Sequence, residues 1–97
     1  MILTGKAKGD FVKWVYSEYD YKYEHLKDFY PLHLLDGLII EWFDSVGIYV
    51  DVNKWSLSFW RSSIYYPYLK SLGCGFSTRQ EATTEAIIKA NEIYNEL

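Results

Sequence analysis

The fold is decided by residues 48–60, which read Ile48-Tyr49-Val50-Asp51-Val52-Asn53-Lys54-Trp55-Ser56-Leu57-Ser58-Phe59-Trp60. Apolar and polar residues alternate along residues 48–53 and again along residues 55–59. A period of two is typical of a strand with one buried face. The short connection at Asn53-Lys54 suits a tight turn, because Asn tolerates a positive φ. The pattern therefore predicts an antiparallel β-hairpin over residues 48–60 with one dry face.

The segment before this hairpin has the spacing of an amphipathic helix. Pro31 suits the first helical position, where its missing N–H would have no intrahelical partner. Apolar residues then recur every three or four positions, at Leu34, Leu35, Leu38, Ile39, Trp42, Phe43 and Val46. Gly47 suits the left-handed residue that follows a helix end. We expect a helix over Pro31–Val46 whose solvent side carries Asp36, Glu41 and Asp44.

Two further helices are predicted at the ends of the chain. The first runs from near Gly5 to Tyr19, with Thr4 as its N-cap residue. The last begins with a capping box, in which Thr78 caps the helix and Glu81 reaches back to the Thr78 N–H. Its small residues form one row that lets the helix lie close to a sheet: Ala82, Ala86, Ala90 and Ile93.

A third strand completes the predicted sheet. It lies over either Tyr65–Leu72 or Leu69–Phe76, with Pro67 at an edge or a strand start because proline cannot donate to a ladder. The Tyr-rich segment Tyr19–Tyr30 suits a short edge strand and an ordered loop equally. The sequence thus predicts a single α+β domain over residues 1–97. We expect a two-layer sandwich of order α-α-β-β-β-α, whose antiparallel sheet contains the hairpin 48–60 covered by helices.

Three stretches at the two ends and in the middle of the chain carry a family resemblance. They are residues 3–8 (LTGKAK) with Phe11 and Trp14, residues 43–51 (FDSVGIYVD), and residues 78–82 (TRQEA), 86–87 (AI) and 89–96 (KANEIYNE). Together they resemble a group of short uncharacterised proteins from phages and mobile elements of gut anaerobic bacteria. The chain departs from that group at Gly9 and at Gly73-Cys74-Gly75. The resemblance implies a phage or prophage setting, and it supplies no catalytic or binding residues.

Composition excludes several classes of protein. Of the 97 residues, 49% are hydrophobic and the net charge is −3, so the chain is not of the disordered type. The longest apolar run falls well short of the ~18–20 residues of a membrane span. The polar and glycine residues near the N-terminus interrupt any secretory signal, so we expect a cytoplasmic protein without a membrane partner. Cys74 is the only cysteine, which excludes an internal disulfide and a cysteine-based metal cluster.

Candidate chemistry in the sequence is sparse. His25 and His33 are separated by Pro31, which breaks any common helix that could hold a metal ion between them. Cys74 lies between two glycines, and no catalytic cysteine signature accompanies it. Paired carboxylates fall on the polar faces of the expected helices. We therefore expect no catalytic residue, no metal, no cofactor and no enzyme activity.

Aromatic residues, which make up 20% of the chain, are the unusual feature. Trp60 falls out of phase with the apolar row Trp55, Leu57 and Phe59, and a Tyr-rich stretch follows it. Tyr and Trp are enriched at the energetic centres of protein interfaces. The expected function is therefore an accessory role through protein–protein contact, with a host or phage protein or with a second copy of the chain. The expected patch is exposed and consists of Trp60, Tyr65, Tyr66 and Tyr68.

The alternative function is weak binding of single-stranded or structured nucleic acid by segment 54–79. This segment contains four bases and no acid, interleaved with aromatic residues on which nucleobases can stack. The bases are Lys54, Arg61, Lys70 and Arg79. The acidic net charge argues against strong binding, because affinity for nucleic acid comes from neutralised phosphates. Nucleic acid is therefore the less favoured partner.

Overall fold

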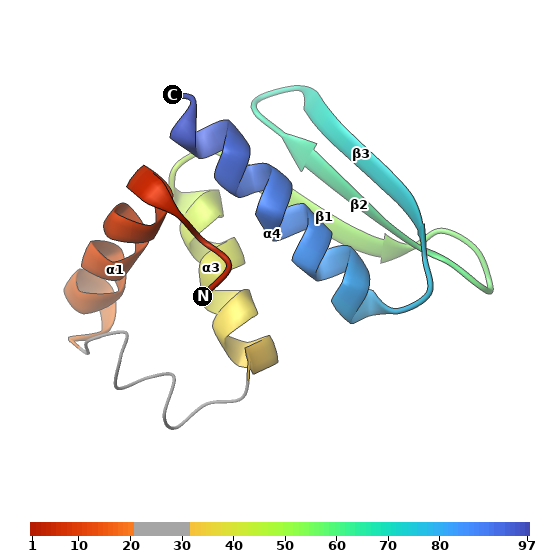
Figure 1. The fold of residues 1–97 in the computed structure, drawn as a ribbon, viewed down its shortest axis with the longest axis horizontal. Helices are drawn as coiled ribbons and strands as arrows, with labels where there is room; N and C mark the ends of the chain where they lie inside the picture. Colours follow the sequence, from red (N-terminus) through yellow and green to blue (C-terminus); the bar gives the residue numbers. More distant parts are fainter. Residues whose placement is uncertain (21–31) are drawn as a thin grey trace.

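The computed structural model describes residues 1–20 and 32–97 (Figure 1). Within these residues the elements are α1 (Gly5–Tyr19), α3 (Leu32–Ser45), β1 (Tyr49–Lys54), β2 (Trp60–Tyr65), β3 (Leu69–Phe76) and α4 (Arg79–Asn95). The strands form one antiparallel sheet in the order β1-β2-β3. The α+β class and the order α-α-β-β-β-α are confirmed. Pro31, His25 and the alternatives for residues 21–30 lie outside the described residues.

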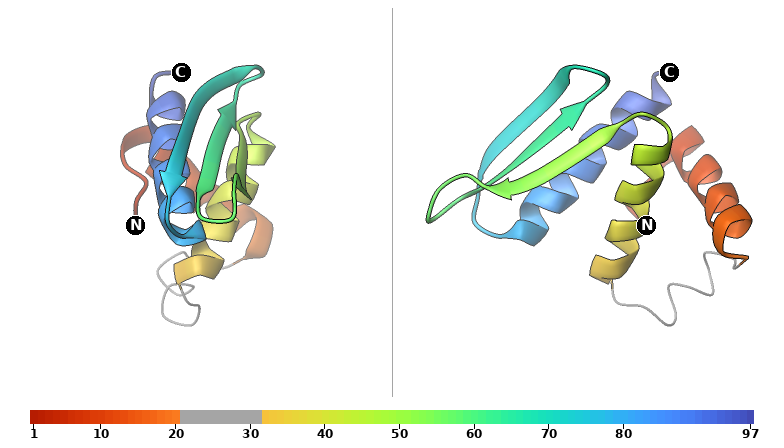
Figure 2. Two further views of the ribbon diagram at one scale, coloured as in Figure 1. Left: turned by 90° about the vertical axis from the view of Figure 1, so that its right-hand side faces the viewer. Right: turned by 180° about the vertical axis from the view of Figure 1, so that it is seen from behind.

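The molecule has two layers, because α4 lies across one face of the sheet (Figure 1). The predicted alanine row of α4 faces the strands, and Ala82, Ala86 and Ala90 are all fully buried. Helices α1 and α3 extend this layer beyond the sheet and pack with α4 around an aromatic core. Seen from behind, the strands lie nearest the viewer, and no described helix crosses the outer face of the sheet (Figure 2). No described helix therefore shields this face of the sheet.

The predicted turn of the hairpin is wrong. Strand β1 continues through Asn53 and Lys54, and Lys54 pairs with Trp60. The chain reverses instead over residues 55–59, where the Trp55 N–H donates to the Phe59 carbonyl at 2.9 Å and the Phe59 N–H donates to Ser56 Oγ at 3.2 Å. The alternation over residues 55–59 is therefore a turn with exposed apolar side chains. It is not a strand with a dry face.

Strand β3 occupies the second of the two predicted ranges, Leu69–Phe76. Residues 66–68 connect it to β2, so Pro67 lies in the turn between the two strands. The Tyr66–Pro67 peptide bond in this turn is cis. The pairing of β2 with β3 is irregular at Trp60/Arg61 and at Ile64/Tyr65. Gly75 has a φ of +86°, a conformation that residues with a Cβ rarely adopt.

The start of α1 is capped from the other end of the chain. Thr4 stands at the N-cap position as predicted, but its hydroxyl makes no capping hydrogen bond. Asn95 Oδ1 of α4 accepts from the Ala7 N–H at 2.8 Å, and Asn91 Oδ1 accepts from the Thr4 N–H at 2.9 Å. The Thr4 hydroxyl instead accepts from Asn91 Nδ2 at 3.0 Å. The two termini are therefore joined by amide side chains.

The capping box of α4 is confirmed in one of its two bonds. Thr78 Oγ1 accepts from the Glu81 N–H at 3.1 Å. The Glu81 carboxylate does not return to the Thr78 N–H, because it accepts from the backbone N–H and the hydroxyl of Ser77, at 3.3 and 3.1 Å. Ser77 and Thr78, which precede α4, thus both form hydrogen bonds with Glu81 in the first turn of the helix.

The predicted solvent position of Asp36 is wrong. Its side chain is only 2% exposed, because the first turn of α4 lies over this part of α3. Gln80 Nε2 donates to Asp36 Oδ2 at 2.9 Å and supplies the hydrogen bond that a buried acceptor needs. Glu41 and Asp44 are exposed as expected.

Candidate interaction surfaces

The strand register determines which side chains lie on the outer face of the sheet. Val50 and Ile64 are cross-strand partners, and both are buried in the core beneath α4. Their neighbours along the strands therefore point away from α4, because successive strand residues alternate between the faces. Tyr49 pairs with Tyr65 on this outer face, and their ring centroids are 5.9 Å apart.

Apolar side chains gather at one end of the outer face. Leu69 pairs with Tyr65, Leu72 pairs with Ser63, and Tyr68 lies in the adjoining turn. Their exposed fractions are 51% for Leu69, 58% for Leu72, 81% for Tyr68 and 52% for Tyr49. We call this group the outer patch: Tyr49, Tyr65, Tyr68, Leu69 and Leu72. Such a contiguous exposed apolar group is typical of an interaction site.

The four residues of the predicted aromatic patch do not share one face. Trp60 is paired with Lys54 in the row that faces α4, and its side chain is only partly exposed. Tyr66 packs against the core, where its ring lies near Gly47. Tyr65 and Tyr68 are the two that belong to the outer patch. The expectation that Trp60 is out of phase with a buried row fails because residues 55–59 form the turn.

A second exposed apolar group lies at the opposite end of β1 and β2. The turn between these strands projects beyond the sheet (Figure 2). It carries Trp55, Leu57 and Phe59, with exposed fractions of 57%, 96% and 43%. We call residues 55–59 the hairpin tip. Sequence reasoning missed this group, because the same three residues were expected to form the dry face of a strand.

The four predicted basic residues are also divided between surfaces. Lys54 Nζ and the Arg79 guanidinium lie 5.7 and 4.6 Å from the centre of the Trp60 ring. Arg61 follows Trp60 and so points to the outer face, opposite Asn53. Lys70 is exposed near the start of β3, at the far end of the sheet. The structure brings Lys54 and Arg79 together at the base of the hairpin tip and leaves the other two apart.

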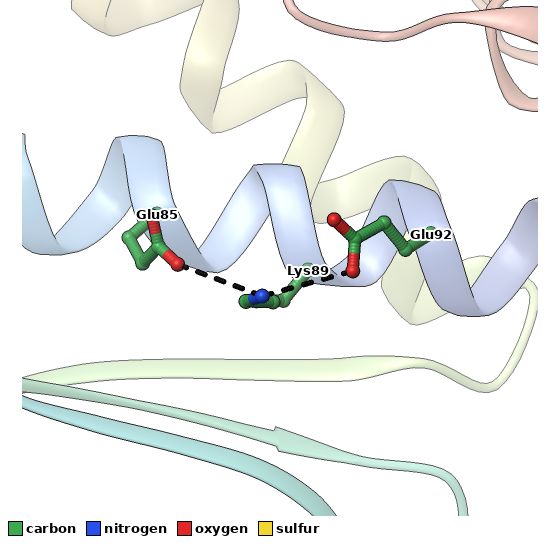
Figure 3. A network of polar contacts seen from close by, with 3 residues as sticks. All are labelled: Glu85, Lys89 and Glu92. Carbon is green, nitrogen blue, oxygen red and sulfur yellow. Dashed lines mark ion pairs between the residues drawn. The ribbon is translucent and has the colours of Figure 1, made fainter.

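The described residues also carry an ion-pair network, an open depression and one cysteine. On α4, Lys89 Nζ lies 4.0 Å from Glu85 Oε1 and 3.8 Å from Glu92 Oε2, in exposed ion pairs of small energetic value (Figure 3). An open depression between α3 and α4 is lined by Asp36, Gly37, Ile40, Arg79, Gln80 and Thr83. Cys74 is exposed and free. No group of metal-binding side chains occurs among the residues that the structure describes.

No protein-family model, no curated protein and no solved structure matches this chain. Within residues 1–20 and 32–97, no helix is long and apolar enough to span a bilayer. The candidate surfaces are therefore judged on their own geometry.

Proposed function

We propose that this protein is a non-enzymatic binding module, an accessory protein of a phage or mobile element, that binds a protein partner through the outer patch. The observation that carries the proposal is a face of the sheet that no described helix covers, where two neighbouring tyrosine rings are bordered by exposed leucines. Tyrosine supplies a large, rigid contact area with a polar end. It therefore suits a surface that is exposed to water in the free protein and buried in the complex. The phage or mobile-element setting rests on the resemblance of the three sequence stretches.

The size of the outer patch fits a focused contact. Binding energy at protein interfaces is concentrated in a few central side chains, and aromatic residues are prominent among them. Tyr49 and Tyr65 are suited to form such a centre, because their rings lie side by side with centroids 5.9 Å apart. Leu69 and Leu72 on β3 add apolar area next to them. The partner is expected to present an apolar surface of similar width.

Photocrosslinking in the native host cells tests the proposal. A photoreactive phenylalanine analogue replaces Tyr68, which is 81% exposed beside the outer patch. The control carries the same analogue at Tyr16 of α1, which is 55% exposed and far from the sheet. We expect a discrete crosslinked protein at position 68 that is absent at position 16. The Leu72→Ser variant should weaken this crosslink strongly.

Two results would separate the possible partners. A crosslinked product of twice the chain mass would identify a second copy of this chain as the partner. A product of another mass would identify a host or phage protein. Equal crosslinking at positions 68 and 16, or crosslinking that survives Leu72→Ser, would refute the outer patch as the binding surface.

A further inference from the structure

The hairpin tip presents its apolar side chains in an unusual way. Leu57 is 96% exposed at the end of a turn that projects beyond the sheet (Figure 2). Trp55 and Phe59 flank it at 57% and 43% exposure. The turn is held by its own hydrogen bonds, since Ser56 Oγ accepts from the N–H groups of Ser58 and Phe59 at 3.3 and 3.2 Å. The tip therefore displays three apolar groups on a closed, preformed loop.

Two cationic side chains lie at the base of this tip. Lys54 and Arg79 both lie against the Trp60 ring, one on the strand that enters the turn and the other at the start of α4. Residues 54–80 contain no acid. The two acids that border this segment keep their charge but do not pair with Lys54 or Arg79 in the described structure, since Asp51 accepts from Asn53 at 2.8 Å and Glu81 accepts from Ser77 at 3.3 Å. The hairpin tip is apolar at its end and cationic at its base. This arrangement is complementary to a surface that has anionic groups outside and an apolar layer beneath them.

We propose that the hairpin tip inserts into the interface of an anionic lipid membrane, with Lys54 and Arg79 against the headgroups. Trp and Phe are suited to the boundary between headgroups and acyl chains, and Leu57 is suited to the acyl region. Basic residues add attraction to anionic lipids. A nucleic acid is the weaker fit, because Leu57, the most exposed of these side chains, offers no flat ring for a base to stack on.

This proposal departs from the expectation of no membrane contact, which rested on the absence of a long apolar run. Such a run detects a segment that crosses the bilayer, and it is insensitive to three side chains on one turn. The proposal is independent of the outer patch. The two surfaces lie at opposite ends of β1, because Tyr49 begins the strand and Lys54 ends it. One protein could therefore hold a partner and touch a membrane at the same time.

Vesicle sedimentation of the full chain tests the proposal. Vesicles of mixed phosphatidylserine and phosphatidylcholine are compared with vesicles of phosphatidylcholine alone. We expect binding to the mixed vesicles that weakens in high salt, because the Lys54 and Arg79 contacts are screened. Leu57→Ser should weaken binding about tenfold, since a buried leucine loses its transfer free energy. Lys54→Gln and Arg79→Gln should each weaken it about fivefold.

Matched variants distinguish this proposal from the outer patch. Leu72→Ser removes an exposed leucine of the outer patch and should leave vesicle binding unchanged, while Leu57→Ser should leave the Tyr68 crosslink unchanged. Trp55→Phe should keep the binding but reduce a vesicle-induced blue shift of tryptophan emission. The lipid proposal fails if mixed vesicles do not bind, or if Leu57→Ser binds them as the native chain does. It also fails if the tip variants lose affinity only for an oligothymidylate probe.

Discussion

The hydroxyl of Tyr94 on α4 donates a hydrogen bond of 2.6 Å to Asp10 Oδ2 on α1. The ring of the same tyrosine packs edge-on against the buried Trp42 of α3, with centroids 4.8 Å apart. One side chain of α4 therefore links this helix to both α1 and α3. The hydrogen bond to Asp10, desolvation and the nearby charge of Asp10 together raise the pKa of Tyr94 to about 12, from an ordinary value of 10.0.

The raised pKa of Tyr94 predicts a loss of stability at alkaline pH. Because the folded state holds the phenol proton more tightly than the unfolded state does, this contribution is fully present below pH 10 and is lost as pH rises toward about 12. Urea denaturation of the native chain and of Tyr94→Phe should therefore show a difference in unfolding free energy that shrinks between these pH values. The exposed Tyr16→Phe controls for the loss of a tyrosine elsewhere. A difference that stays constant with pH would contradict the linkage.

The cap that Asn95 provides to α1 predicts a measurable cost for its removal. Asn95→Ala leaves the Ala7 N–H without the acceptor that lies 2.8 Å away, which should lower the free energy of unfolding by about 1 kcal/mol. Asn95→Asp loses the Nδ2 bond to the Thr4 carbonyl at 3.0 Å, but it keeps the acceptor and adds negative charge at the N-terminus of α1, so it should lose less than Asn95→Ala. Glu96→Ala, one residue further on, is the matched control. Thermal denaturation of the three variants checks this order, and equal losses in all of them would argue against the cap.

Local patterns explain why most of the fold could be predicted. The helices that end at Tyr19 and near Val46 and the alanine row of α4 follow from periodicity within one element. The range of β3 was narrowed only to two alternatives, of which the structure has Leu69–Phe76. The missed features depend on residues distant in the chain. Thr4 is bonded by Asn91 and Asn95, and Asp36 by Gln80, 44 residues away. No spacing within one segment reveals such a partner.

The hairpin turn was mispredicted for a different reason. Trp55, Leu57 and Phe59 alternate with serines, which is the pattern of a half-buried strand. Serine is also a turn residue, and Ser56 closes the turn with its hydroxyl. Alternation alone does not distinguish a half-buried strand from a turn. For this reason the hairpin tip was not predicted as a candidate surface. The outer patch could be predicted in part from the sequence, because the alternation over residues 48–53 assigns Tyr49 to the polar face of its strand.

The close approach of α4 to the sheet predicts that a larger residue at position 86 is destabilising. Ala86 is fully buried in the core cluster that also contains Val50 and Ile64. Leucine there would have to displace packed neighbours, so Ala86→Leu should lower the free energy of unfolding by roughly 1–3 kcal/mol. Glu92→Leu on the exposed side of the same helix controls for the new residue. Urea denaturation measures both, and an unchanged midpoint for Ala86→Leu would mean that α4 can move away from the strands.

The bond between Gln80 and Asp36 predicts strong coupling between two helices. Gln80→Leu removes the donor that lies 2.9 Å from a buried carboxylate oxygen, and this should cost about 1–3 kcal/mol. The double variant Asp36→Leu with Gln80→Leu replaces both polar groups by apolar ones and should recover much of that loss, because no buried acceptor is left unpaired. Urea denaturation of the two single variants and the double variant gives the coupling free energy. If the loss of the double variant equals the sum of the losses of the two single variants, the bond does not hold α3 to the start of α4.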